Sequence, residues 1–191
     1  MNKNKITKGK HLSKLADSLT LFRLFVGLPI VIALGNGYFF IAWGLILISG
    51  ISDIADGYLA RKSGSGTVWG ARYDPLADKL ALSAPLIYLA RNYSIPIWSL
   101  WLLISRELII TSWRSNQIEG GPASKAGKAK TILLFISVLF MTWPPSLGSD
   151  KMVDLFHNVG FILYWPSLFF SIKSAMRYLM DQSTDDQNLS Q

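Results

Sequence analysis

The chain has 191 residues, of which 50% are hydrophobic and only 16% are charged, and its mean hydropathy is +0.31. Soluble domains are about one-quarter charged and disordered chains are poor in apolar residues, so the composition argues against both classes for most of this chain. The formal net charge of +7 would suit a nucleic-acid binder, but a basic membrane protein also accounts for the apolar bulk.

Six segments approach the roughly 20 apolar residues that a membrane-spanning helix needs, which predicts an all-α integral membrane protein. A basic tail, residues 1–14, precedes them and is expected to lie on anionic headgroups or to be solvated and disordered. The first segment ends at a Gly-Asn-Gly turn, and Asp74 before Pro75 has the form of an N-cap for the third. In chain order the segments are residues 19–34, 38–61, 74–89, 96–113, 126–143 and 153–172.

The distribution of positive charge predicts the orientation of these helices. Fourteen of the 19 Lys and Arg lie in the N-terminal tail, in the 61–72 and 114–130 loops and near the C-terminal end. Because cytoplasmic loops are enriched in Lys and Arg, both termini and these two loops are expected in the cytoplasm. The expected organisation is a juxtamembrane segment over 1–18, a six-helix domain over 19–180 and a polar, disordered tail over 181–191.

Acidic residues gather at the ends of the second and third apolar segments. Carboxylates at membrane depth cost several kcal/mol unless they are paired, metal-bound or hydrated, so they mark a candidate functional site. The four acidic residues here fall at helical spacing, which puts each pair on one face of its helix. Two antiparallel helices with these faces opposed would bring four carboxylates together: Asp53, Asp56, Asp74 and Asp78.

Four like charges need cations, and the residue types favour hard metal ions. Carboxylate oxygens prefer Mg²⁺, Mn²⁺ or Ca²⁺, and the chain has no Cys for a zinc–thiolate site. Two such ions would suit phosphoryl-group chemistry. Gly57 and Ala60 leave room on the same helix face for a flat ligand such as a nucleobase, and Arg61 could bind a phosphate. Two alternatives stay open: the carboxylates pair with Arg and Lys to hold helices together, or they serve a cation or proton transporter.

The same residues carry a resemblance to a known family. The run Asp-x2-Asp-Gly-x2-Ala-Arg-x8-Gly-x3-Asp-x3-Asp, over residues 53–78, resembles the signature of the CDP-alcohol phosphatidyltransferases. The resemblance implies a six-helix membrane fold with a polar cavity open to the cytoplasm, often in a homodimer. It implies transfer of a phosphatidyl group from CDP-diacylglycerol to an alcohol, and it gives no role to nucleic acid. The expected location is a bacterial inner membrane or an equivalent organelle membrane, with the active site facing the cytoplasm.

The resemblance also implies roles for the residues of the signature. Asp53, Asp56, Asp74 and Asp78 would bind two divalent cations, Mg²⁺ or Mn²⁺, and Asp78 would also be the catalytic general base. The small residues would make room for the cytidine, and Arg61 would hold the diphosphate. The residues expected to bind the CDP-lipid are Thr20, Gly57, Ala60, Arg61 and Gly70.

Basic residues of the fourth and fifth segments bear on the acceptor alcohol. Lys and Arg at a helix start form a natural phosphate site, and the residues expected to bind an acceptor phosphate are Arg106, Arg114, Lys128 and Lys130. With a Leu-Thr-x-x-Arg segment at Thr20 and Arg23, this pattern is similar to family members that use sn-glycerol 3-phosphate.

Other interpretations of these basic residues and other acceptors are open. Arg106 could instead pair with Glu107 or with a signature Asp, and the two Lys could simply flank a membrane segment. The phrase Asp-Pro-Leu-Ala-Asp-Lys at residues 74–79 is shared with family members that use phosphatidylglycerol, and inositol phosphate is a further candidate acceptor.

Overall fold

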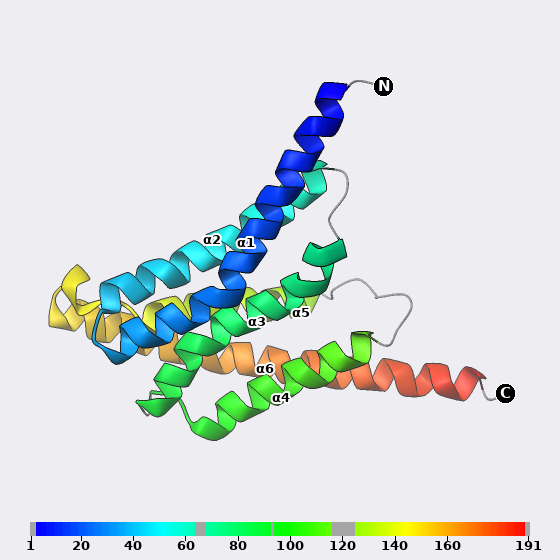
Figure 1. Cartoon of the computed structure of the whole chain (residues 1–191). Coiled ribbons are helices and arrows are strands. Elements are labelled where there is room, and N and C mark those ends of the chain that lie inside the picture. The colour runs from blue at the N-terminus through cyan, green and yellow to red at the C-terminus, as the bar shows by residue number, and fades with distance from the viewer. Residues whose placement is uncertain (1–2, 64–67, 93, 116–124, 190–191) are drawn as a thin grey trace. The chain divides into compact units, whose positions relative to one another are not determined.

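The computed structural model describes the backbone of residues 3–63, 68–92, 94–115 and 125–189. It describes side chains over residues 14–15, 17–55, 58, 73, 76–92, 94–111 and 130–176. Within these ranges the structure is helical and has no strand, which confirms the predicted all-α class there (Figure 1). The elements are α1 (Lys3–Gly35), α2 (Phe39–Ser63), α3 (Val68–Arg91), α4 (Ile97–Ser115), α5 (Lys125–Met141), the 3₁₀ turn η1 (Pro145–Leu147) and α6 (Asp150–Leu189).

Each predicted segment corresponds to one α-helix, but three boundaries differ. Helix α1 begins at Lys3, so the described backbone of the basic tail, residues 3–14, is helical rather than disordered. Helix α3 begins at Val68, which makes Asp74 its seventh residue, so the predicted N-cap is wrong. Helix α6 continues to Leu189, so the predicted disorder of the polar tail is wrong up to that residue.

The differences have a common physical reason. Extending an existing helix costs much less free energy than nucleating a new one, and residues 177–189 contain no Gly or Pro that would end α6. An Asp-Pro pair favours a helix start, but Pro is also tolerated inside helices of membrane proteins. Pro29 of α1 and Pro166 of α6 likewise lie inside their helices.

The contacts divide the chain into two compact units, Met1–Tyr88 with Thr142–Val153 and Leu89–Met141 with Asp154–Gln191. In the first unit α1 and α2 pack against each other in opposite directions (Figure 1). They are joined at the predicted Gly-Asn-Gly turn, where Gly37 has a φ of +79°. The N–H of Gly37 donates to the Leu34 carbonyl at 3.2 Å and that of Tyr38 to the Ala33 carbonyl at 2.8 Å, which is a Schellman motif.

Small residues let α3 approach α1 closely within this unit. A Cβ added at Gly27 of α1 would lie 3.2 Å from the carbonyl oxygen of Leu80 and 3.4 Å from the Cβ of Ala84. Ala77, Ala81 and Ala84 of α3 are buried. Small side chains at helix interfaces are typical of membrane proteins, because they let helix backbones approach. The short separation brings polar groups of α1 within reach of α3.

In the second unit α6 packs on both α4 and α5 through polar contacts. The Tyr164 hydroxyl donates to Ser99 Oγ at 2.8 Å, and the Ser137 hydroxyl donates to the Gly160 carbonyl at 2.7 Å. A Cβ added at Gly160 would lie 2.7 Å from the backbone N of Met141 and 2.8 Å from the Ser137 carbonyl oxygen. The Met141 Cγ would also lie at 2.7 Å, but the other two obstacles are backbone atoms, so only Gly fits this α5–α6 crossing without a shift.

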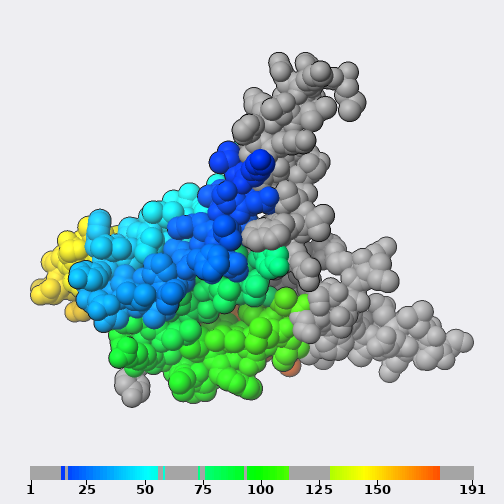
Figure 2. Space-filling model, viewed as in Figure 1, coloured from blue at the N-terminus to red at the C-terminus, as the bar shows by residue number. Residues whose placement is uncertain are grey.

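Two helices of the described chain are long and apolar enough to cross a membrane, over Asp17–Gly35 and Asp150–Met176. Shorter apolar stretches cover Phe39–Ala55 and Lys130–Met141. In the space-filling view α1 lies at the surface (Figure 2), and its exposed side chains form an apolar stripe at helical spacing, made of Leu21, Phe25, Leu28 and Ile32. Such a stripe is the surface expected against lipid tails. Six crossings and their orientation stay predictions.

The close α5–α6 crossing predicts that Gly160→Ala destabilises the protein. The added methyl group must push helix backbones apart, which costs about 1–3 kcal/mol and lowers the unfolding temperature by roughly 5 °C. Thermal unfolding in detergent micelles, followed by circular dichroism, measures the change. The matched control is Gly44→Ala in α2, where an added Cβ meets nothing within 4 Å. An equal loss in both variants would contradict the proposed backbone clash.

Candidate active site

A buried arginine gathers two of the signature carboxylates. Arg23 lies on α1, and its side chain is only 1% exposed. Its Nη1 donates to Asp53 Oδ1 on α2 at 2.5 Å and also to Asp78 Oδ1 on α3. Three helices of the first unit therefore meet at one guanidinium group. Such charge-assisted hydrogen bonds are stronger than neutral ones.

The two carboxylates remain accessible although the guanidinium is not. The Asp53 side chain is 51% exposed and the Asp78 side chain is 39% exposed. The arginine thus holds the carboxylates from the protein interior and leaves much of their surface open. Carboxylate oxygens that converge on one cation also fit Mg²⁺ or Mn²⁺, which prefer hard oxygen ligands. Asp53 and Asp78 could therefore both offer oxygen ligands to a divalent cation.

For the other predicted residues of the signature, the structure shows the helix to which each belongs but not the position of its side chain. Asp56, Gly57, Ala60 and Arg61 belong to α2, and Gly70 and Asp74 belong to α3. Their side chains lie outside the described set, so the structure does not test the predicted gathering of four carboxylates. Among the side chains that are described, no group of three or more His, Cys, Asp or Glu could hold a metal ion.

Sequence reasoning missed the partnership of Arg23 with the signature. The available signal was a single arginine inside an apolar segment, because an ionisable residue at membrane depth needs a partner. The alternative interpretation, in which the carboxylates pair with Arg, is correct for Asp53 and Asp78. Thr20, predicted to bind the CDP-lipid, lies one helical turn before Arg23 and is buried.

A second ionic cluster connects α4, α5 and α6 of the other unit. Arg106 of α4 donates from Nη1 to Glu107 Oε1 at 2.5 Å, from Nε to the Ser171 carbonyl at 3.1 Å and from Nη2 to Ser174 Oγ at 3.3 Å. Lys130 of α5 donates to the same Glu107 oxygen. The Arg106 and Lys130 side chains are about nine-tenths buried.

This cluster brings together two of the four residues that were predicted to bind an acceptor phosphate. Arg106 and Lys130 converge on one carboxylate oxygen, so the alternative pairing of Arg106 with Glu107 is correct. Two cations that share one anionic oxygen are arranged as they would be around a phosphate oxygen. The side chains of Arg114 and Lys128 lie outside the described set.

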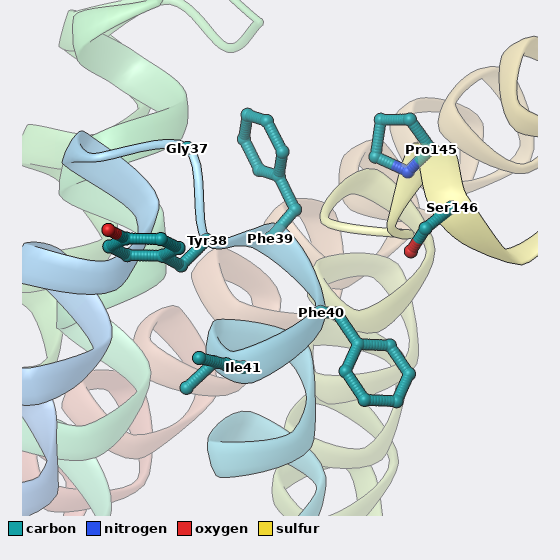
Figure 3. Close-up of a pocket in the computed structure, with 7 residues that line it drawn as sticks. All are labelled: Gly37, Tyr38, Phe39, Phe40, Ile41, Pro145 and Ser146. Carbon is teal, nitrogen blue, oxygen red and sulfur yellow. The ribbon is translucent and has the colours of Figure 1, made fainter.

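A surface hollow of about 530 Å³ lies at the far end of α2 from Asp53. It is lined by the start of α2 and by η1, with Phe39, Phe40 and Pro145 among its walls (Figure 3). Phe39 and Asp53 are 14 residues apart on one helix, which is about 21 Å. The hollow is mostly apolar and has no carboxylate in its lining, so it is distinct from the acidic site.

Comparison with known proteins supports an enzyme. Residues 13–173 match the CDP-alcohol phosphatidyltransferase family. The chain is 36% identical over 143 residues to a probable phosphatidylglycerophosphate synthase of Mycobacterium tuberculosis (strain ATCC 25618 / H37Rv), covering 71% of this chain and 68% of the relative. It is 35% identical over 140 residues to the CDP-diacylglycerol–glycerol-3-phosphate 3-phosphatidyltransferase of Bacillus subtilis (strain 168), covering 70% and 69%.

A relative that covers more of the chain bears the same name. It is the CDP-diacylglycerol–glycerol-3-phosphate 3-phosphatidyltransferase of Mycoplasma genitalium, which is 32% identical over 193 residues and covers 86% of this chain and 82% of its own length. The family match spans both units, from α1 into α6. With this extent of similarity and the complete signature, the chain belongs to the CDP-alcohol phosphatidyltransferase family of enzymes.

Proposed function

We propose that this enzyme transfers the phosphatidyl group of CDP-diacylglycerol to sn-glycerol 3-phosphate, giving phosphatidylglycerol phosphate and CMP. The observation that carries the proposal is the convergence of Asp53 and Asp78, the first and last carboxylates of the signature, at one buried cation. Family membership supports the reaction class. The names of the relatives support the donor and the acceptor, and the family match leaves the cation-transporter alternative without support.

In this proposal the signature carboxylates hold two divalent cations, Mg²⁺ or Mn²⁺. When bound, the cations would supply positive charge at the diphosphate of the CDP-lipid. Asp53 and Asp78 offer accessible oxygen ligands from two helices, and Asp56 and Asp74 would complete the site. Thr20, Gly57, Ala60, Arg61 and Gly70 would bind the CDP-lipid, with Arg61 at its diphosphate and the small residues beside the cytidine.

Asp78 is proposed as the general base. Its carboxylate would accept the proton of the acceptor hydroxyl, whose oxygen forms a bond to the phosphorus of the phosphatidyl group. The bond from that phosphorus to the oxygen of the CMP phosphate breaks, and CMP leaves with both electrons of that bond. The exposed part of Asp78 gives an acceptor hydroxyl access to the carboxylate, while Arg23 fixes the carboxylate from within.

The acceptor phosphate is proposed to bind to Arg106, Arg114, Lys128 and Lys130. Glu107 supports this assignment, because its carboxylate already orients the ends of Arg106 and Lys130 toward one point. The bonds of Arg106 to Ser171 and Ser174 of α6 further fix the guanidinium. An acceptor that carries a phosphate is the kind of ligand that such a cationic group selects.

The proposed setting is a bacterial inner membrane or an equivalent organelle membrane. The positive charge of the tail and loops supports six crossings with both termini and the acidic site on the cytoplasmic side. The two long apolar helices and the lipid substrate support insertion in a bilayer. A homodimer is proposed on family resemblance.

The reaction predicts CMP release from CDP-diacylglycerol that requires both glycerol 3-phosphate and Mg²⁺ or Mn²⁺. Purified protein in mixed micelles is assayed for CMP, with EDTA as the metal-free control and with phosphatidylglycerol and inositol phosphate as competing acceptors. CMP release with only one of the competing acceptors would contradict the assignment of glycerol 3-phosphate as the acceptor. No metal-dependent release with any of the three would overturn the reaction.

The base assignment predicts that Asp78→Asn lowers kcat by about 10²–10⁴-fold, because an amide cannot accept the proton. The matched control is Asp154→Asn, which changes an exposed carboxylate of α6 in the same way and should keep near-normal turnover. Circular dichroism confirms that both variants are helical. Near-normal kcat for Asp78→Asn would refute its role as base.

The acceptor assignment predicts that Arg106→Gln raises the KM for glycerol 3-phosphate by about 10–100-fold, because a charged hydrogen bond to the phosphate is lost. The KM for CDP-diacylglycerol should change little. Arg91→Gln, at an exposed position in the last turn of α3, is the matched control. Equal increases in both KM values would indicate general damage rather than loss of an acceptor contact.

A further inference from the structure

We propose that Arg23 is the internal counter-ion of the acidic site and holds Asp53 and Asp78 together when no divalent cation is bound. This inference rests on the proposed metal binding by these carboxylates. It gives Arg23 a positioning role, since the residue is proposed to act on the substrate through the carboxylates that it holds. The site would then be preformed before metal or substrate arrives.

The burial of Arg23 is the first argument. A guanidinium that is 1% exposed has lost almost all contact with water, so its charge must be balanced by protein groups. Asp53 and Asp78 supply that balance from two different helices. Because the two carboxylates are half-exposed, a cation can reach them from outside without displacing Arg23.

The charge of the signature is the second argument. Helices α2 and α3 together carry four carboxylates within 26 residues, and like charges that face each other weaken helix packing. One positive charge between Asp53 and Asp78 reduces this repulsion without the help of a metal ion. A divalent cation at the accessible oxygens would reduce the same repulsion, so the two kinds of cation partly substitute for each other in stabilising the unit.

The backbone geometry is the third argument. Gly27 lies four residues after Arg23, which puts both on one face of α1. At Gly27, α1 and α3 are so close that an added Cβ would lie 3.2 Å from the carbonyl oxygen of Leu80. Leu80 lies two residues after Asp78 on α3. The close approach of α1 and α3 thus accounts for the ability of Arg23 to reach α3 while it also bonds to α2.

The test compares thermal unfolding of wild type and Arg23→Met in detergent, each in EDTA and in saturating Mn²⁺. Methionine keeps the length of the stem but removes the charge. In EDTA the variant should unfold about 10 °C below wild type, because a buried ion pair has lost its cation. Mn²⁺ should recover most of this loss, so the shift produced by Mn²⁺ should be larger in Arg23→Met than in wild type.

Three further variants make the interpretation specific. Gly160→Ala, which weakens the other unit, should lower the unfolding temperature equally with EDTA and with Mn²⁺. Arg23→Lys should unfold at a higher temperature in EDTA than Arg23→Met, since the charge is retained.

If Arg23→Met does not fold, the double variant Arg23→Met with Asp53→Asn tests the same point. It removes one cation and one carboxylate together, so it should fold in EDTA where Arg23→Met alone does not; failure of the double variant to fold in EDTA would contradict the counter-ion role.

The outcomes separate the two proposals. If Mn²⁺ shifts wild type but recovers none of the loss in Arg23→Met, the counter-ion role is wrong and the metal site stands. Arg23→Lys no more stable than Arg23→Met would also overturn the counter-ion role. If Mn²⁺ shifts neither wild type nor any variant, the proposed metal site fails, and the inference about Arg23 fails with it.

Discussion

The first unit depends on the neutralisation of one buried positive charge. A guanidinium inside an apolar segment costs several kcal/mol unless anionic groups surround it. Arg23 meets that requirement only if α2 and α3 bring their carboxylates to α1. The helix positions of Asp53 and Asp78, the small residues of α3 and the glycine at position 27 are all consistent with that single requirement. In the first unit, the contacts that join α1, α2 and α3 thus also bring together two of the signature carboxylates.

The second unit obeys the same constraint with the charges reversed. Here one carboxylate, Glu107, lies between two cations from α4 and α5, and the arginine also bonds to α6. An apolar interface would hold such helices at lower cost, because a buried ion pair seldom stabilises more than the apolar residues that would replace it. The presence of ionic clusters in both units thus argues for ligand chemistry more than for stability.

The sequence was sufficient for the helices and for the reaction class, but only partly for the site. Apolar length located each α-helix of the described residues, though not the 3₁₀ turn η1, and the Gly-Asn-Gly turn was correctly placed at Gly37. The ends of α1, α3 and α6 could not be predicted, because local signals such as Asp-Pro compete with the low cost of extending a formed helix. The spacing of the carboxylates predicted which faces they share, but a one-dimensional pattern does not say which residue of a third helix meets them.

That limit applies with particular force to Arg23, which lies 30 residues before Asp53 and 55 before Asp78. No periodicity connects positions so far apart, and the eight-residue signature begins only at Asp53. The physical rule that could have linked them is charge balance: an apolar segment with one arginine must meet a segment with surplus carboxylate. Glu107 follows the same rule, since a carboxylate in an apolar helix needs the cations that α4 and α5 provide. In a chain with few charges, pairing each buried charge with a partner therefore predicts tertiary contacts that helical spacing alone leaves open.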